Sequence, residues 1–165
     1  MNLSEPILAE LSYESATARR LLERLPQQQF GWKPHEKSMT LARLATHVVE
    51  IPGWVASILD QDEFDVGARE YVPKDASSVP ELLQMFEKNI AAIREAIGRQ
   101  TNERMMAPWR LKKKGQLIFE LPRIGMIRSM LMNHFIYHRG QLSVYIRLLN
   151  VPVPSIYGPS ADEPM

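Results

Sequence analysis

The fold is decided by one stretch near the carboxyl end, residues 124–149, which reads IGMIRSMLMNHFIYHRGQLSVYIRLL. Apolar side chains recur along it at three- and four-residue steps, the spacing that places them on one face of an α-helix. Pro152 and Pro154 follow and prevent the helix from continuing. We therefore expect one long helix from about Ile124 to Leu149. Its inward face is predicted to carry Ile127, Met130, Leu131, His134, His138, Leu142, Tyr145 and Leu149.

This predicted helix is also apolar outside its inward face. Met132, Phe135, Ile136 and Ile146 all fall there. A second buried surface is therefore expected. Two interpretations are open: the surface packs against neighbouring elements of the same chain, or it forms a helical homodimer interface.

Two helices are predicted in the first third of the chain. The first runs from an N-cap at Ser4 to Pro26, which stops it because proline lacks the N–H that the next backbone hydrogen bond needs. The second is capped by Ser38 or Thr40 and carries apolar residues at helical spacing. Pro52-Gly53 interrupts this second pattern, and a kink within one continuous helix is expected there.

The middle of the chain combines a loop, a third helix and an extended region. Residues 63–77 contain glycine, proline and scattered charge without periodicity, which indicates a loop. Ser78 and Glu81 form a capping box for a third helix that ends at Gly98. Short alternating runs on either side of Lys114-Gly115 predict a small extended hairpin or flap before the last helix.

Length and composition are typical of one folded domain. The chain has 165 residues, of which 45% are hydrophobic and 24% are charged, ordinary values for a globular protein. We expect an all-α fold of four helices in a single domain over residues 1–165, with the hairpin or flap inserted before the last helix. No window approaches a membrane span, and no basic and then apolar leader begins the chain, so a soluble, cytoplasmic protein is expected.

Charge and cysteine content argue against several classes of function. Twenty basic and nineteen acidic residues nearly balance, which leaves no large field to attract nucleic acid or an anionic membrane, and neither is expected as a partner. The basic run Lys112-Lys113-Lys114 is interpreted as a solvated turn. Cysteine is absent, which excludes disulfides, thiolate ligands and a cysteine nucleophile, so any thiol chemistry must use an external thiol.

Three of the four histidines lie on predicted inward helix faces. His134 and His138 are four residues apart, which stacks both rings on one face within reach of a single ion. This spacing alone is weak evidence, but His47 lies in the apolar stripe of another helix, where an unpaired imidazole is costly. We predict that the three bind one divalent ion, Zn²⁺, Ni²⁺, Fe²⁺ or Co²⁺, with water or substrate in the remaining positions. The alternative is that they are satisfied core groups without a metal.

Two neighbours of these histidines are candidates to orient the rings. A metal-bound histidine usually donates its second ring nitrogen to an oxygen. Glu50 follows His47 by one turn, and Gln141 follows His138 by one turn. For Glu50 a solvent-facing position is an equally good interpretation. No metal role is predicted for His35 in its loop, or for Tyr137 and Arg139, to which packing and a salt bridge are assigned.

Two segments carry a family resemblance. Two stretches, Leu44-Ala45-Thr46-His47-Val48-Val49-Glu50 and Asn133-His134-Phe135-Ile136-Tyr137-His138-Arg139-Gly140-Gln141-Leu142, resemble the DinB/YfiT-like family. The resemblance covers nearly the whole chain, including the extended stretch before the last helix that ends in Leu121-Pro122-Arg123. The resemblance implies an up-down-down-up four-helix bundle, usually dimeric, with a metal held by the matching His47, His134 and His138. Relatives include thiol-dependent S-transferases, a mycothiol-dependent isomerase and metal-dependent hydrolase-like proteins.

Two classes of function follow from these expectations. In the first, the protein is a metal-dependent transferase or hydrolase whose ion activates water or an external low-molecular-weight thiol for attack on a small-molecule substrate. Glu50 is then the nearest candidate for a general base. In the second, the protein is a non-enzymatic, stress-associated dimer in which the ion is structural. Four aromatic residues that could shape a pocket match no substrate-specific pattern: Trp32, Trp54, Tyr71 and Trp109.

Overall fold

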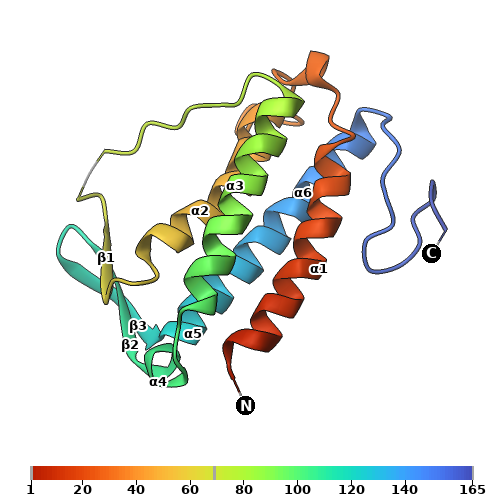
Figure 1. Ribbon diagram of the computed structural model, residues 1–165. Helices are drawn as coiled ribbons and strands as arrows, with labels where there is room; N and C mark the ends of the chain where they lie inside the picture. Colours follow the sequence, from red (N-terminus) through yellow and green to blue (C-terminus); the bar gives the residue numbers. More distant parts are fainter. Residues whose placement is uncertain (1, 69, 165) are drawn as a thin grey trace.

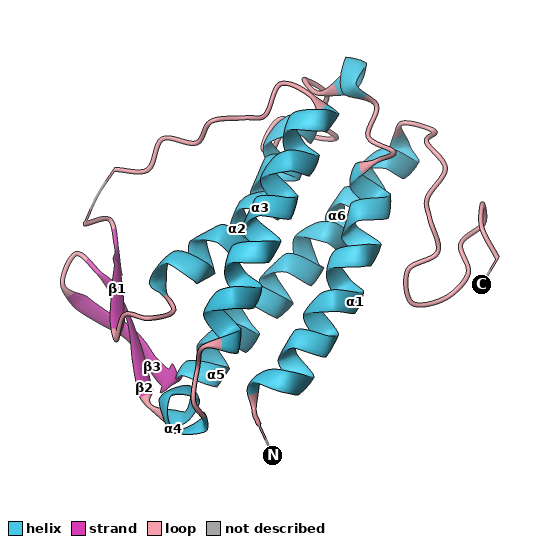
Figure 2. Ribbon diagram, in the orientation of Figure 1, coloured by secondary structure: helices cyan, strands magenta, loops and turns pink. Residues whose placement is uncertain are grey.

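Four long helices dominate the computed structural model, which describes residues 2–68 and 70–164. Helices α2 and α3 run in the opposite direction to α1 and α6 in Figure 1. Both α2 and α1 contact α3 and α6. The protein is therefore mostly helical, with a small sheet at one end (Figure 2). The long helices are α1 (Ser4–Leu22), α2 (Leu41–Ile58), α3 (Val79–Gly98) and α6 (His134–Leu148).

A hydrophobic core fills the space between the long helices. Met132, Phe135 and Ile146, which lie outside the predicted inward face of the last helix, are fully buried within the same chain. The ring of Phe135 stacks on Phe86 of α3 with centroids 6.1 Å apart. Packing within the chain therefore accounts for these three residues. Within the described residues, no helix is long and apolar enough to cross a bilayer.

The start and the end of α1 differ from the prediction. Ser4 is the first helical residue and not the N-cap. Its backbone N–H donates to Asn2 Oδ1 (3.1 Å), and its buried hydroxyl donates to the carbonyl oxygens of Ile97 (3.1 Å) and Gln100 (3.3 Å). The serine was misassigned because its partner is the distant end of α3. The helix also ends at Leu22, short of the predicted stop at proline.

Two of the predicted helix caps are confirmed. Thr40 caps α2, its hydroxyl accepting from the backbone N–H of Arg43 (3.1 Å). Ser78 caps α3 by accepting from the N–H of Glu81 (3.2 Å), whereas the Glu81 carboxylate accepts from Ser77 (2.7 Å). The two halves of the capping box therefore involve neighbouring serines. Both caps are local signals, which is why the sequence predicts them well.

Helix α2 continues through Pro52 as one element and packs closely on α3. The contact is made where Gly53 faces Asn89, whose side-chain amide donates to the carbonyl of Val49 (2.7 Å). A Cβ atom at position 53 would lie 2.6 Å from Asn89 Oδ1. Glycine is therefore required by the neighbouring helix, since this asparagine is fixed by its own hydrogen bond.

Substituting Gly53→Ala is expected to destabilise the protein by about 1–2 kcal/mol, because overpacking outweighs the better helix propensity of alanine. Gly140→Ala in α6 is the matched control: position 140 is exposed and a Cβ there meets nothing within 4 Å. The free energy of unfolding of this control is expected to rise by up to about 1 kcal/mol. Urea unfolding of both variants measures the difference, and equal gains at both positions would contradict close packing at residue 53.

A three-stranded sheet lies beside the far end of α2. Strands β2 (Pro108–Lys113) and β3 (Gln116–Pro122) form the predicted antiparallel hairpin, with Lys114 (φ 50°) and Gly115 (φ 80°) as its turn. Positive φ at both positions matches a tight hairpin turn. Strand β1 (Glu63–Val66) pairs in parallel with β2, so the prediction of a loop over residues 63–77 is wrong for its first four residues. A four-residue strand is too short to show a period.

The last predicted helix is a single helical path with three parts. It comprises α5 (Arg123–Met126), a π-helical segment η2 (Ile127–Asn133) and α6. The expectation of one regular helix is therefore corrected for η2. Apolar periodicity could not reveal this change, because a seven-residue segment spans too few turns to distinguish a π-helix from an α-helix. A short helix α4 (Asn102–Met106) precedes the hairpin.

Candidate metal centre

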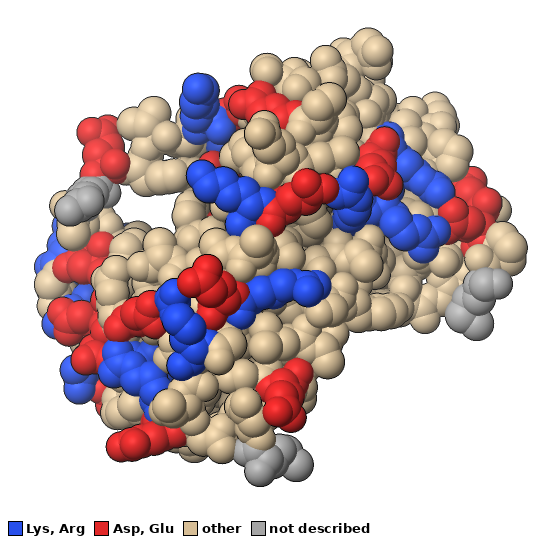
Figure 3. Space-filling view, viewed as in Figure 1, with Lys and Arg blue, Asp and Glu red and all other residues tan. Residues whose placement is uncertain are grey.

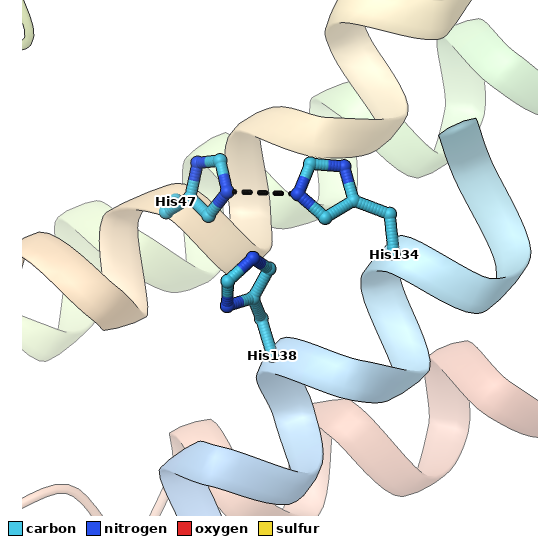
Figure 4. Close-up of side chains that lie close together, drawn as sticks. All are labelled: His47, His134 and His138. Atoms are coloured by element: carbon cyan, nitrogen blue, oxygen red, sulfur yellow. Dashed lines mark hydrogen bonds between the residues drawn. The ribbon is translucent and has the colours of Figure 1, made fainter. Parts of the chain in front are cut away.

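The three predicted histidines meet between two helices. His47 projects from α2 toward α6, where His134 and His138 stand one above the other (Figure 4). One ring nitrogen of each lies within 4.8 Å of those of the other two. The Nε2 atoms of His47 and His134 are 3.1 Å apart. Each residue is half-buried, so the group is open on one side.

This geometry is close to that of a bound divalent ion. Tetrahedral zinc with nitrogen ligands at about 2.0–2.1 Å holds two ligand nitrogens roughly 3.3 Å apart. The 3.1 Å separation of His47 and His134 approaches that distance. The group spans up to 4.8 Å, so the rings must move closer together to bind one ion with all three nitrogens. The group could therefore hold a metal ion with three protein ligands.

Hydrogen bonds orient two of the three rings. Nδ1 of His138 donates to Oε1 of Gln141 (2.7 Å), which confirms the predicted contact and leaves Nε2 with a free lone pair. His134 makes a hydrogen bond to the backbone carbonyl of Met130. Because its Nε2 faces His47, the nitrogen that makes this bond is Nδ1. Such partners fix the tautomer and the direction of a metal ligand.

The π-helical segment η2 ends at Asn133, immediately before His134. In a π-helix each backbone N–H reaches back five residues and not four, so the side chains that follow are rotated relative to a regular helix. The carbonyl of Met130, near the end of η2, accepts from the His134 ring. This local widening therefore helps to place the first histidine of α6. Such segments occur often at functional sites.

Burial keeps two of the histidines, His47 and His134, in the neutral form that a metal ion requires. Burial, with smaller contributions from His138, His134 and Arg43, lowers the pKa of His47 to about 4. Burial also lowers the pKa of His134, with a smaller contribution from His138. Both rings are therefore neutral near pH 7. A neutral imidazole has the lone pair that a metal ion requires, so proton competition is weak.

The carboxylate of Glu50 has other partners than His47. Its Oε2 accepts from Arg43 Nη2 and from the hydroxyl of Tyr71 (3.0 Å). The predicted hydrogen bond to His47 is not among the contacts of the described residues. Arg43, on the same helix, binds the carboxylate instead. The prediction considered only the spacing between Glu50 and His47 and therefore missed this partner. Whether Glu50 acts as a general base stays a prediction.

Aromatic rings border the histidine group. Trp54 contacts His47 edge-on with centroids 5.3 Å apart, and Tyr71 contacts Trp54 at 5.4 Å. Trp54 follows His47 by seven residues, which places both on one helix face, so the contact was detectable from sequence. Tyr71 lies in a loop without periodicity and gave no such signal. The ring of Tyr137, which is 61% exposed, lies 5.0 Å from that of His138.

The remaining neighbours take the structural roles predicted for them. His35 lies outside the group, in a loop where its Nδ1 accepts from the N–H of Lys37 (3.1 Å). Arg139 turns away from the histidines and forms a buried ion pair with Glu14 of α1. Neither contributes a ligand atom to the group formed by the three histidines.

The protein is mostly helical, and three histidines converge between two of its helices in a group that is open on one side. These features define a helical protein with a candidate metal site. The particular family follows from comparison with known proteins. The DinB family model matches residues 2–165, and the chain belongs to the DinB family.

Relatives and solved structures are consistent with this membership. The protein YrdA of Bacillus subtilis is 27% identical over 157 residues, which cover 94% of this chain and 89% of YrdA. A crystal structure of a DinB-like protein from Bacillus cereus matches with a TM-score of 0.69 and 21% identity, covering 93% of this chain and 97% of that chain. The crystal structure of a second DinB-like protein, YjoA from Bacillus subtilis, matches with a TM-score of 0.67 and 17% identity. This match covers 89% of this chain and 96% of that chain. These structures show a shared fold.

Proposed function

We propose that this protein binds one divalent metal ion, Zn²⁺, Ni²⁺ or Fe²⁺, through His47, His134 and His138 and acts as a metal-dependent enzyme on a small molecule. The observation that carries this proposal is the convergence of three ring nitrogens within 4.8 Å. Three imidazole ligands suit these ions and leave coordination positions for other ligands. The reaction class is S-transfer or hydrolysis.

The protein's own contribution is to hold the ligands and limit water around them. Gln141 and the Met130 carbonyl fix two rings, and Trp54 covers one side of His47. A divalent ion in such a site supplies Lewis acidity, which makes a bound water or an external low-molecular-weight thiol more acidic and thus nucleophilic. An external thiol is needed for S-transfer, because the chain has no cysteine.

Metal content tests this proposal directly. Untagged wild-type protein is expected to contain about one equivalent of Zn, Ni or Fe, whereas His134→Ala and His138→Ala retain less than about a tenth of it. His35→Ala is the matched control, since His35 lies in an exposed loop away from the group, and it should keep the wild-type content. Elemental analysis measures the content and circular dichroism verifies folding. No metal in wild type, even after reconstitution, would overturn the proposal.

A structural ion is the second candidate. The three ligands come from only two helices, so an ion would join α2 to α6 across 87 residues of sequence. Such an ion contributes its binding free energy to folding. In a non-enzymatic, stress-associated dimer, a chelator should lower the melting temperature by many degrees while no turnover is found. In an enzyme, His138→Ala should abolish turnover while the fold largely survives.

Replacing Gln141 is expected to weaken metal binding without removing a ligand. Gln141→Leu keeps a side chain of similar size but leaves Nδ1 of His138 without its acceptor. Partners of this kind typically change metal affinity by about 10- to 100-fold. Competition with a chromophoric chelator measures the affinity. Gln116→Leu on the exposed hairpin is the control, and equal affinities in both variants would mean that Gln141 does not orient the ligand.

The arrangement and assembly of the chain are part of the same proposal. We propose a single domain over residues 1–165, an up-down-down-up four-helix bundle, which forms a homodimer in the cytoplasm. The helix directions and pairwise contacts support the bundle. Tyr137, Val144 and Leu148 support the dimer, because they are more than half exposed and share one face of α6. Light scattering of the purified protein tests the dimer.

Nucleic acid and membrane partners are not proposed. Acidic and basic side chains are interspersed on the face shown in Figure 3, without a large patch of one sign. The formal net charge of +1 agrees with this distribution. A protein that binds phosphate backbones usually concentrates basic residues on one face.

A further inference from the structure

A groove of about 750 Å³ lies between the second half of α2 and strand β1 with the residues after it. Small-molecule sites typically have volumes of about 300–1,000 Å³. None of the described residues that line this groove is one of the three histidines. Trp54 connects the two places, because its ring lines the groove and also contacts His47. The groove is therefore a separate cavity that borders the candidate metal centre.

Three aromatic side chains line the groove: Trp54, Phe64 and Tyr71. All three are substantially exposed, at 37%, 37% and 54% respectively. The rings of Trp54 and Tyr71 meet at 90° with centroids 5.4 Å apart, which makes an aromatic corner. The faces of aromatic rings attract cations, and sets of such rings recognise ammonium groups.

The hydroxyl of Tyr71 holds this corner in place. It donates to Glu50 on α2 (3.0 Å), while Asp75 pairs with Arg43 (2.9 Å) and the N–H of Ala76 donates to Thr46 (2.9 Å). The segment that carries Tyr71 is thus fixed to successive turns of α2. An aromatic wall held by such contacts loses little entropy on binding a ligand.

The described residues that line the groove carry formal charge of one sign only. Its described lining contains Glu63, Asp65 and Glu70 but no lysine or arginine. Glu63 pairs with Lys112 (2.7 Å), and Asp65 accepts from two backbone N–H groups of the hairpin turn. Glu70, in contrast, has no ion-pair partner in the part of the chain that the structure describes. The sequence from 61 to 71 has four acidic residues and one basic residue, Arg69, so its formal charge is negative.

We propose that this groove binds an organic cation, an ammonium group carried on an apolar or aromatic body. The aromatic corner and Glu70 contact the ammonium group, and the apolar body lies along Ile58 and Val66. The ring of Trp54 keeps the cation away from the ion at the histidines, which limits repulsion between them. That this ligand is the substrate class of the metal centre rests on the proposed function. Cation binding itself does not depend on the metal.

Titration calorimetry with benzyltrimethylammonium tests the proposal on the full-length protein. Two compounds with the same ring serve as comparators: phenylacetate, which is an anion, and benzyl alcohol, which is neutral. The cation is expected to bind saturably and at least about tenfold more tightly than either. Glu70→Gln and Trp54→Leu are each expected to weaken binding roughly three- to tenfold. Glu36→Gln, an exposed carboxylate in a distant loop, is the matched control and should leave it unchanged.

Two further variants separate the possible failures. His134→Ala lacks a proposed metal ligand, and its affinity for the cation should be within about twofold of that of wild type. This variant shows whether loss of the metal alone changes binding in the groove. Trp54→Phe keeps an aromatic face and should bind within about threefold, which shows that any loss in Trp54→Leu is not misfolding. Equal binding of the anion or the neutral compound, or no effect of Glu70→Gln, would overturn the proposal.

Discussion

Replacing Arg123 by Met is expected to destabilise the protein by about 3–5 kcal/mol, because it removes a fully buried charge together with its hydrogen bonds. The guanidinium donates to the carbonyl oxygens of Leu59, Gln61 and Arg104, each at 2.8 Å, and to the carboxylate of Asp62 (2.9 Å). Its side chain is 0% exposed. Methionine fills a similar volume but leaves buried carbonyls unpaired, and each costs about 1–3 kcal/mol.

The position of Arg123 explains why so large an effect is expected. Helix α2 ends at Ile58, so Leu59 and Gln61 lie just after its C-terminus, and Arg104 lies near the end of α4. A cation at helix C-termini satisfies carbonyls that have no partner within the helix. Arg123 itself begins α5, so one side chain joins the ends of two helices to the start of the path that leads to the histidines of α6.

Two controls define the test of Arg123. Arg123→Lys retains the charge but not the planar fork of donors, and should fall between wild type and Arg123→Met. Arg99→Met removes an arginine with a 53% exposed side chain that pairs with Asp60, where exposed pairs contribute about 0–1 kcal/mol. Urea unfolding at one protein concentration measures all three. Similar stabilities for Arg123→Met and Arg99→Met would mean that the buried guanidinium is replaceable.

The helices and the histidine group were predictable because their signals are local or are repeated in a regular way. The caps at Thr40 and Ser78 need only neighbouring residues. The convergence of His47 with His138 followed from their places on inward helix faces, since a core offers few positions for a polar ring. The contact of Gln141 with His138 spans only three residues. Each of these predictions depends on where a residue lies within its own helix.

The features that the sequence did not reveal depend on partners far along the chain. Strand β1 exists because β2, more than forty residues later, supplies its hydrogen bonds. Ser4 reaches the end of α3, and Glu50 is engaged by Tyr71 from a loop. The π-helical segment before His134 spans only seven residues, too few for the apolar spacing to distinguish it from an α-helix. Spacing therefore identifies the candidate ligands, whereas tertiary contacts determine which groups orient them and shape the groove.

The buried ion pair of Arg139 and Glu14 joins α6 to α1 one residue after His138. Arg139 is 2% exposed and Glu14 is 4% exposed. Arg139 also donates to the backbone carbonyl of Glu14 (3.2 Å) and to the hydroxyl of Tyr157 (2.6 Å), which in turn lies 2.9 Å from both carboxylate oxygens. Burial, and then the hydrogen bond to Glu14, raise the pKa of Tyr157, so the phenol stays protonated and donates to the carboxylate.

Arg139→Met is expected to lower the free energy of unfolding by about 3–5 kcal/mol, because the carboxylate of Glu14 is left buried without its cation. The double variant Glu14→Met, Arg139→Met should recover at least about half of that loss, since neither charge then remains to be compensated. Arg147→Met is the matched control on the same helix. Its pair with Asp162 is partly exposed, with side-chain exposures of 45% and 27%, and should contribute only about 0–1 kcal/mol.

Arg139→Met also distinguishes two roles of the ion pair: stabilising the fold, and positioning the histidines of the candidate metal centre. If the ion pair only stabilises the fold, Arg139→Met should retain about one equivalent of metal under conditions where it is folded. If it also fixes the rotation of α6, the affinity for metal should fall while that of Arg147→Met does not. We expect the second result, because His138 and Arg139 are adjacent on one rigid helix and any rotation of α6 moves both. Unchanged affinity in a folded Arg139→Met variant would limit the pair to stability alone.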